Sequence, residues 1–215
     1  MNNKILLIGG GGHCRSIIDV LLEDDLYSEI GIIDQQTINV DTFPPKVKYL
    51  GTEDNLEKLI NLGWKNAFVA IGSIGDTSNR RRVFDLLKKL DFCIPNLISK
   101  YAVVSKNCRL GKGIFISKGA VVNIGSSVGD CCIINTNSVI EHDCCVEEFS
   151  HISPGAILCG GVKVGLDSHI GAGSIVKQYI TIGNNSIVGM GSIVTSDVCS
   201  DSIYYGNPCR FIRKK

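Results

Sequence analysis

A histidine between two carboxylates is the strongest candidate for chemistry in this sequence. His142 lies between Glu141 and Asp143 in the stretch Val-Ile-Glu-His-Asp. A neutral imidazole oriented by a carboxylate can act as a general base near neutral pH, and such a base typically contributes ~10²–10⁴ to a reaction rate. The alternative is a surface histidine in a charged turn. The place of His142 in the fold has to decide between the two.

A run of glycines near the start of the chain is the second candidate. The apolar residues 4–8 predict a buried strand, and the glycines at 9–12 and His13 lead from it into an amphipathic helix. Strand, glycine turn and helix in this order are typical of a Rossmann-like nucleotide-binding unit, in which backbone N–H groups approach a phosphate at the helix N-terminus. The full Gly-x-Gly-x-x-Gly motif is absent because Cys14 occupies its last position. A plain tight turn therefore stays open as the alternative.

Later strands add residues to this candidate site. Asp34 ends a strand predicted over 30–33, and an acid there suits contact with a ribose or base, although a turn cap is as good an explanation. Gly72 ends a strand predicted over 67–71, and the helix predicted over 78–90 carries Arg80, Arg81 and Arg82. One arginine would reach a phosphate, whereas a solvated basic face is the commoner meaning of such a run. The predicted substrate-binding residues are Gly10, Gly11, Gly12, His13, Asp34, Gly72 and Arg80.

These elements predict an α/β Rossmann-like domain over residues 1–95. Its parallel sheet is expected to be short, with four or five strands. Residues 35–48 are expected to form a loop, and a helix is predicted over 52–62.

The rest of the chain, residues 96–215, is organised by a six-residue period. Every sixth residue is Ile, Val or Leu: Ile98, Val104, Leu110, Ile116, Val122, Val128, Ile134, Ile140, Val146, Ile152, Leu158, Val164, Ile170, Val176, Ile182, Val188 and Val194. A fixed six-residue period indicates a parallel β-helix. Small residues usually stand two before each aliphatic, so both point inward on a strand. Three such sides make a triangular coil of 18 residues, with ~4.8 Å between coils.

The outward residue before each aliphatic sorts the prism into three faces. Two are apolar: one carries Val103, Val121, Val139, Ile157, Ile175 and Ile193, and the other carries Leu97, Phe115, Ile133, His151, His169 and Ile187. The remaining face is polar. Large apolar faces are rarely left in water, so a homotrimer is predicted, with each apolar face against a neighbour's other apolar face. In one chain the corner bearing His142 lies opposite the face bearing His151, so a site shared between them would be built across the subunit interface.

Composition excludes several classes of protein. The net charge is +1 with scattered charges, which predicts no nucleic-acid or membrane surface. No signal peptide and no apolar run long enough to span a bilayer are visible. The ten cysteines include no Cys-x-x-Cys, and they are interpreted mainly as reduced packing residues in a cytoplasmic protein.

Nearly the whole chain resembles the NeuD/PglD-like sugar acyltransferases, which pair a short Rossmann-like domain with a left-handed β-helix of hexapeptide repeats. The stretches that match are residues 8–13, 33–34, 70–72, 135–143 (Asn-Thr-Asn-Ser-Val-Ile-Glu-His-Asp), 149–156 and 206–210. The left hand of the helix is implied by this resemblance, since crossover connections are usually right-handed.

The resemblance also implies the roles of individual residues. His142 would be the general base with Asp143 as its acidic neighbour, and His151 and Gly160 would lie against the acetyl thioester. The C-terminal tail would contact coenzyme A through Gly206, Pro208 and Arg210, with Cys209 where the family has Ala. The glycine turn, His13, Asp34 and Gly72 match the residues that hold UDP in members that use a nucleotide sugar.

The activity implied is acetyl-CoA-dependent N-acetylation, without a metal, of the 4-amino group of a UDP-linked amino-dideoxy sugar of the UDP-N-acetylbacillosamine type. O-acetylation of sialic acid or a related free sugar is the main alternative. Others are a zinc site made by His142, His151 and His169, as in γ-class carbonic anhydrases, a non-catalytic scaffold trimer, and a nucleophilic Cys144 or Cys145.

Overall fold

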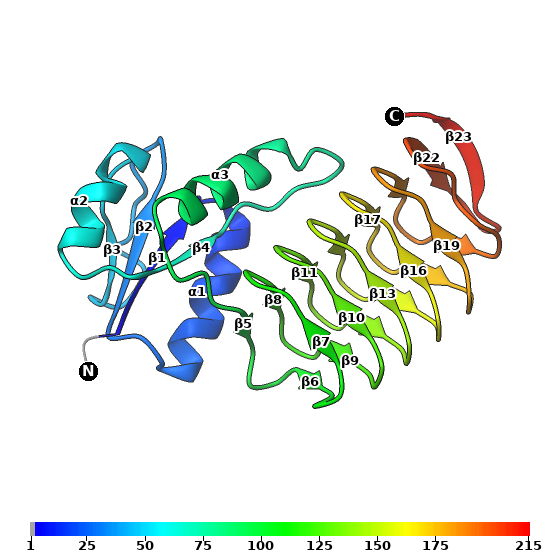
Figure 1. The fold of residues 1–215 in the computed structure, drawn as a ribbon, viewed down its shortest axis with the longest axis horizontal. Coiled ribbons are helices and arrows are strands. Elements are labelled where there is room, and N and C mark those ends of the chain that lie inside the picture. Colours follow the sequence, from blue (N-terminus) through cyan, green and yellow to red (C-terminus); the bar gives the residue numbers. More distant parts are fainter. Residues whose placement is uncertain (1–2) are drawn as a thin grey trace. The chain divides into compact units, whose positions relative to one another are not determined.

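The computed structural model describes residues 3–215 and divides the chain into two compact units (Figure 1). The first unit contains the chain up to Gly72 together with Ser78–Leu97, and the second contains Ser73–Thr77 and Ile98–Lys215. The short segment Ser73–Thr77 therefore belongs with the second unit, although both of its flanks belong to the first.

The first unit is built on a four-stranded parallel sheet in the order β3-β2-β1-β4. Its strands are β1 Lys4–Ile8, β2 Glu29–Ile33, β3 Val47–Tyr49 and β4 Asn66–Val69. The central strands β1 and β2 are almost wholly buried, as expected of apolar runs covered on both faces. The helices are α1 Gly12–Asp24, η1 Glu53–Asn55, α2 Leu56–Asn61 and α3 Ser78–Lys89.

Strand β3 corrects the prediction of an uninterrupted loop over residues 35–48. Of its three residues, Val47 is buried whereas Lys48 is exposed. The strand lies at the edge of the sheet, where it pairs only with β2. A single buried side chain gives too short a pattern to be read as a strand from the sequence.

The second unit is a triangular prism of parallel coils with three sheets along its length (Figure 1). The β14 sheet contains β5 Leu97–Ile98, β8 Phe115–Ile116, β11 Ile133–Ile134, β14 His151–Ile152, β17 His169–Ile170, β20 Ile187–Val188, β22 Ser202–Tyr205 and β23 Arg210–Lys214. The β12 sheet contains β6 Val103–Val104, β9 Val121–Val122, β12 Val139–Ile140, β15 Ile157–Leu158, β18 Ile175–Val176 and β21 Ile193–Val194. The β13 sheet contains β7 Arg109–Leu110, β10 Ser127–Val128, β13 Cys145–Val146, β16 Lys163–Val164 and β19 Thr181–Ile182.

The predicted 18-residue coil is confirmed by the register of these sheets. Val139 pairs with Ile157, and His151 pairs with His169, each one coil apart. The aliphatic column forms the core of the prism, with side chains that are almost completely buried. The small inward residues add hydrogen bonds between coils: the Ser150 hydroxyl donates to the carbonyl of Gly165 at 2.8 Å.

The two apolar faces differ in exposure within the single chain. On the β14 sheet, Leu97, Phe115, Ile133 and His169 are already buried. On the β12 sheet, Val103 and Ile175 remain 63% and 38% exposed. The β12 sheet therefore carries apolar side chains that are open to solvent.

Part of the cover on the β14 sheet comes from the segment Ser73–Thr77. The carbonyl of Ser73 hydrogen-bonds His151, and the hydroxyl of Thr77 donates to Asp167 Oδ1 at 2.5 Å. A Cβ added at Gly75 would lie 2.7 Å from Cδ1 of Ile187, so the segment passes close to this strand.

Candidate functional site

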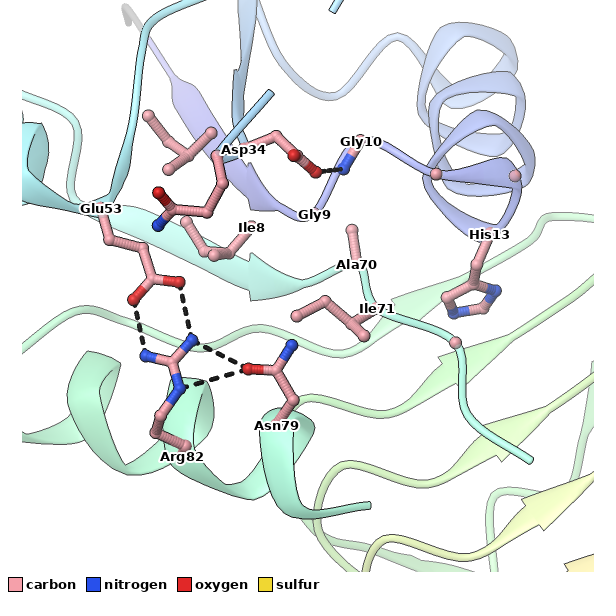
Figure 2. A pocket seen from close by; sticks show the side chains of 15 residues that line it. Ile8, Gly9, Gly10, His13, Asp34, Glu53, Ala70, Ile71, Asn79 and Arg82 are labelled. Carbon is pink, nitrogen blue, oxygen red and sulfur yellow. Dashed lines mark hydrogen bonds and ion pairs between the residues drawn. The ribbon is translucent and has the colours of Figure 1, made fainter. Parts of the chain in front are cut away.

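A cavity of about 560 Å³ opens at the carboxyl ends of the strands in the first unit (Figure 2). It is lined by Ile8, Gly9, Gly10, Gly11, Gly12, His13, Ile33, Asp34, Gln35, Glu53, Ala70, Ile71, Gly72, Asn79 and Arg82. The ends of β1, β2 and β4 thus converge where ligands bind in open α/β sheets.

The glycine turn presents open backbone to this cavity. A Cβ added at Gly11 or Gly12 would meet no atom within 4 Å, so the space in front of both residues is free for a ligand. Gly11 caps the N-terminus of α1, which has no acidic residue in its first turn and no side-chain cap. The positive end of a 13-residue helix is therefore available to an anion.

Asp34 organises the turn from the neighbouring strand. Its Oδ2 accepts a hydrogen bond from Gly10 N–H at 2.7 Å (Figure 2). Its Oδ1 accepts one from Gln36 N–H at 3.0 Å. Asp34 therefore caps a turn, and it also lines the cavity. A ligand contact would use lone pairs that these bonds leave free.

Arg82, and not the predicted Arg80, lines the cavity. Arg82 forms a two-pronged ion pair with Glu53 at 2.7 and 2.8 Å and donates to Asn79 Oδ1 (Figure 2). Arg80 is only 1% exposed and does not line the cavity. It lies three, four and seven residues before Val83, Phe84 and Leu87, which are the buried positions of α3, so the helix period turns it inward.

His13 lies at the end of the cavity beside Gly72. A Cβ at Gly72 would come 3.3 Å from the Cβ of His13. Burial, and then the charge of Arg80, lowers the pKa of His13 from 6.5 to about 4. The imidazole is therefore neutral at physiological pH, and it can exchange hydrogen bonds with a ligand without adding positive charge.

His142 lies in the second unit, at the corner between the β12 and β13 sheets. Its Nδ1 lies 2.9 Å from Asp143 Oδ2, and the two side chains are 52% and 71% exposed. With Nδ1–H donating to the carboxylate, Nε2 keeps a free lone pair and can accept a proton.

Gly160 lies one coil beyond His142 and directly against its ring. A Cβ at Gly160 would be 2.5 Å from His142 Nε2 and 2.6 Å from its Cε1. The next N–H, that of Gly161, donates to the carbonyl of His142 at 2.9 Å. Within residues 3–215 no acceptor is found for Gly160 N–H, so this donor remains available beside the imidazole.

His151 is held in one tautomer on the β14 sheet. Thr136 N–H donates to Asn135 Oδ1 at 2.8 Å, which orients the amide so that its nitrogen donates to His151 Nε2 at 3.1 Å. The opposite nitrogen, Nδ1–H, then donates to the carbonyl of Ser73 at 3.0 Å. His169 packs edge-to-face on His151, with 4.9 Å between the ring centroids.

The burial of His169 predicts a pH dependence of stability. Desolvation lowers its pKa from 6.5 to about 4, so the unfolded chain binds more protons between these values. The free energy of unfolding should therefore rise with pH from about 4 to 6.5, with up to about 3 kcal/mol from this group. Urea unfolding at pH 5 and 7 would measure it, and His169→Gln should flatten the slope.

The unmodified protein, measured at the same two pH values, is the control. An equal slope in His169→Gln and the unmodified protein would contradict the prediction.

The C-terminal tail closes the last coils of the prism. Gly206 has φ +108°, its N–H donates to the Ser192 hydroxyl at 3.2 Å, and its carbonyl accepts from Ile193 N–H at 3.0 Å. Cys209 is buried, whereas Pro208 and Arg210 are exposed. The predicted coenzyme-binding residues of the tail thus lie at the surface, next to strand β21.

The predicted catalytic and thioester-binding residues are only partly brought together by one chain. His142, Asp143 and Gly160 share one corner, whereas His151 is held on the β14 sheet by Asn135 and Ser73. Ser73 could not have been found from spacing because it lies 78 residues from His151 in sequence. The same holds for Glu53, which lies 29 residues from Arg82.

The geometry bears on two of the alternatives, the zinc site and Cys144 as a nucleophile. Within the described part of the chain no three His, Cys, Asp or Glu side chains are placed to hold a metal ion. Burial raises the pKa of the Cys144 thiol to about 11, which disfavours the thiolate that a nucleophile needs.

Over residues 3–215, no helix has the length and apolar character required to cross a membrane.

Comparison with protein families and curated proteins gives one match. Residues 4–87 match the model of the PglD N-terminal domain. No curated protein matches the chain.

Comparison with solved structures extends the similarity to the whole chain. A perosamine N-acetyltransferase from Caulobacter crescentus, solved with CoA and GDP-perosamine, is 31% identical, with a TM-score of 0.91 over 100% of this chain and 99% of that one. The acetyltransferase domain of PglB from Neisseria gonorrhoeae is 32% identical, with a TM-score of 0.90 over 98% of this chain and 100% of that one. WeeI from Acinetobacter baumannii shares the fold at 22% identity and a TM-score of 0.83. The predicted architecture, a Rossmann-like domain followed by a left-handed β-helix, is confirmed.

Proposed function

Because the chain belongs to the NeuD/PglD-like sugar acyltransferases, we propose that it transfers the acetyl group of acetyl-CoA to the 4-amino group of a UDP-linked amino-dideoxy sugar. It is an acetyl-CoA-dependent sugar acetyltransferase, and the sugar acceptor carries a nucleotide and an amino group. The observation that carries the proposal is the arrangement of His142, Asp143 and Gly160 on one corner of the prism.

The chemistry follows from that arrangement. The acceptor amine attacks the thioester carbonyl, and Nε2 of His142 takes the proton that the amine loses. Asp143 holds Nδ1–H and stabilises the imidazolium as it forms. Collapse of the tetrahedral intermediate breaks the C–S bond, and the proton on His142 passes to the departing thiolate of coenzyme A. The products are the amide and free coenzyme A.

The backbone N–H of Gly160 would donate a hydrogen bond to the oxyanion of that intermediate. This N–H is available beside Nε2 of His142, whereas Gly161 N–H is already bonded to the carbonyl of His142. A backbone donor aimed at a developing oxyanion is typically worth ~10²–10³ in rate. His151 and the exposed tail residues Pro208 and Arg210 would contact the acetyl-CoA.

The cavity of the first unit would hold the nucleotide. The diphosphate would lie at the N-terminus of α1, against the open backbone of Gly11 and Gly12. Asp34 would face the ribose or base, and His13 and Gly72 would close the far end. The related Caulobacter enzyme was solved with GDP-perosamine. The identity of the nucleobase, uracil or guanine, is therefore tested together with the activity.

Thiol release from acetyl-CoA tests the proposal directly. The acceptors are UDP-4-amino-4,6-dideoxy-N-acetylglucosamine, GDP-perosamine and free sialic acid. We expect turnover on the UDP sugar, with at least tenfold lower kcat/KM on the GDP sugar. Preference for GDP-perosamine would overturn uracil as the recognised nucleobase. Turnover only on free sialic acid would replace N-acetylation by O-acetylation.

A homotrimer with its active sites at the subunit interfaces is part of the proposal. The exposed residues of the β12 sheet, Val103 and Ile175 among them, support it, because an apolar face of this extent is rarely left in water. Ile175→Asp should lower both the sedimentation coefficient and the activity per subunit. Lys163→Asp, at an exposed outward position of the β13 sheet, is the control and should change neither. A monomeric wild-type protein with full activity would contradict the interface site.

A further inference from the structure

Tyr179 is an exception among the corner residues of the prism. The corners place one residue per turn in the left-handed region, and at most non-glycine positions that residue is Asp or Asn, which adopt this conformation with little cost. The bulkier exceptions on the prism are Cys131, Phe149 and Tyr179. Cys131 and Phe149 are each 2% exposed, so packing compensates for their backbone conformation. Tyr179 has φ +60° and is 76% exposed, so burial in this chain does not account for it.

The phenol ring lies on the glycine pair that flanks His142. A Cβ at Gly161 would be 2.5 Å from Tyr179 Cδ1, just as a Cβ at Gly160 would be 2.5 Å from His142 Nε2. Tyr179 N–H donates to the carbonyl of Gly160 at 3.0 Å, which ties the two coils together at this corner. The pair Gly160 and Gly161 is therefore bracketed by His142 from the preceding coil and by Tyr179 from the following one.

His142 and Tyr179 together limit where an acyl donor can bind at this corner. With its carbonyl oxygen on Gly160 N–H, the thioester has His142 on one side. Beyond His142 the corner is also filled, because Asp143 Oδ1 lies 2.3 Å from where a Cβ of Gly125 would be. In the other direction the next coil, ~4.8 Å farther along the prism, exposes Gln178 and Tyr179, and of these two only Tyr179 carries an aromatic ring.

We propose that Tyr179 is a binding residue for the acyl donor, its ring forming the surface on which the pantetheine arm next to the thioester rests. The inference rests on the proposed function, which places the thioester at Gly160. An aromatic ring with a polar tip suits this arm, in which pairs of methylene groups alternate with amides. The ring contributes to holding the donor in both ground and transition states, so it acts mainly on KM for acetyl-CoA.

The test compares Tyr179→Asn with Tyr179→Phe. Asparagine accepts the left-handed backbone and removes the ring, so the variant should fold at least as stably as the wild type. We expect the Asn variant to raise the Kd and KM for acetyl-CoA about tenfold, with kcat and KM for the nucleotide sugar within twofold of wild type. The Phe variant should stay within about twofold in all of these constants. Tyr101→Asn, which removes another exposed tyrosine of the same unit, is the matched control and should behave as the wild type.

Unchanged acetyl-CoA binding in Tyr179→Asn would overturn the inference. So would dissociation of the oligomer in sedimentation, because Tyr179 would then be a contact with a second copy of the chain. Calorimetry with acetyl-CoA alone separates this inference from the proposed function. A protein that binds acetyl-CoA through Tyr179 but acetylates no nucleotide sugar contradicts the function and keeps the inference, whereas one that does not bind acetyl-CoA overturns both.

Discussion

Replacing His142 by alanine is expected to lower kcat by about 10²–10⁴, with little change in KM for either substrate. The imidazole lies beside the free N–H of Gly160, and its tautomer is set by Asp143 at 2.9 Å. Its side chain is 52% exposed, so its loss opens no cavity in the core and the fold should be retained. Steady-state thiol release measures the effect, and circular dichroism and sedimentation check that the variant is intact.

Asp143→Asn gives a graded companion to this result. The amide can still hydrogen-bond Nδ1 but does not stabilise an imidazolium, so an intermediate loss of kcat is expected. Asn also tolerates the left-handed backbone at this position, where φ is +60°, so the turn should be preserved. Full turnover in a folded His142→Ala protein would remove His142 from the mechanism.

Gly160→Ala is expected to lower kcat by about 10²-fold through a single added methyl group. A Cβ at this position would lie 2.5 Å from His142 Nε2, closer than van der Waals contact allows. The backbone of Gly160 is not in the left-handed region, so alanine imposes no conformational strain of its own. The imidazole therefore has to move away from the backbone N–H of Gly160, which lies beside it in the site. Thiol release measures the loss.

The double variant His142→Ala, Gly160→Ala separates displacement of the ring from damage to the coil. Without the imidazole the added methyl group has space, so its effect on thermal stability should vanish in the double variant. A large destabilisation by Gly160→Ala that persists without His142 would show that the glycine serves the backbone instead.

The prism was predictable almost residue by residue because its rule is local and repeats. Each aliphatic of the six-residue period is the second residue of a short strand, as Ile140 is of β12 and Ile152 is of β14. In the first unit the strands and helices fell close to their predicted bounds, whereas β3 was missed because only Val47 of it is buried.

The functional site was less predictable where it depends on contacts between distant residues. Arg80 and Arg82 are equivalent in composition, and only the phase of the buried side chains on α3 separates them. That phase was present in the sequence and would have identified Arg80 as the inward residue. Arg82 pairs with Glu53, and His151 pairs with Ser73. Both partners come from other elements, and no periodic pattern in the sequence predicts them. The burial of the β14 face in the single chain depends partly on Ser73–Thr77, a segment outside the repeat.

His142 and Gly160 are one coil apart, so the number of residues between them decides whether they lie side by side. His142 and Gly160 adjoin because exactly one circuit of the triangle separates them. A single inserted residue between them would throw both out of alignment. A whole extra circuit added after Tyr179 would extend the prism by ~4.8 Å and leave the corner untouched. Evolution can thus alter the reach of such an enzyme toward a long ligand in discrete steps, by duplicating circuits, without disturbing the chemistry.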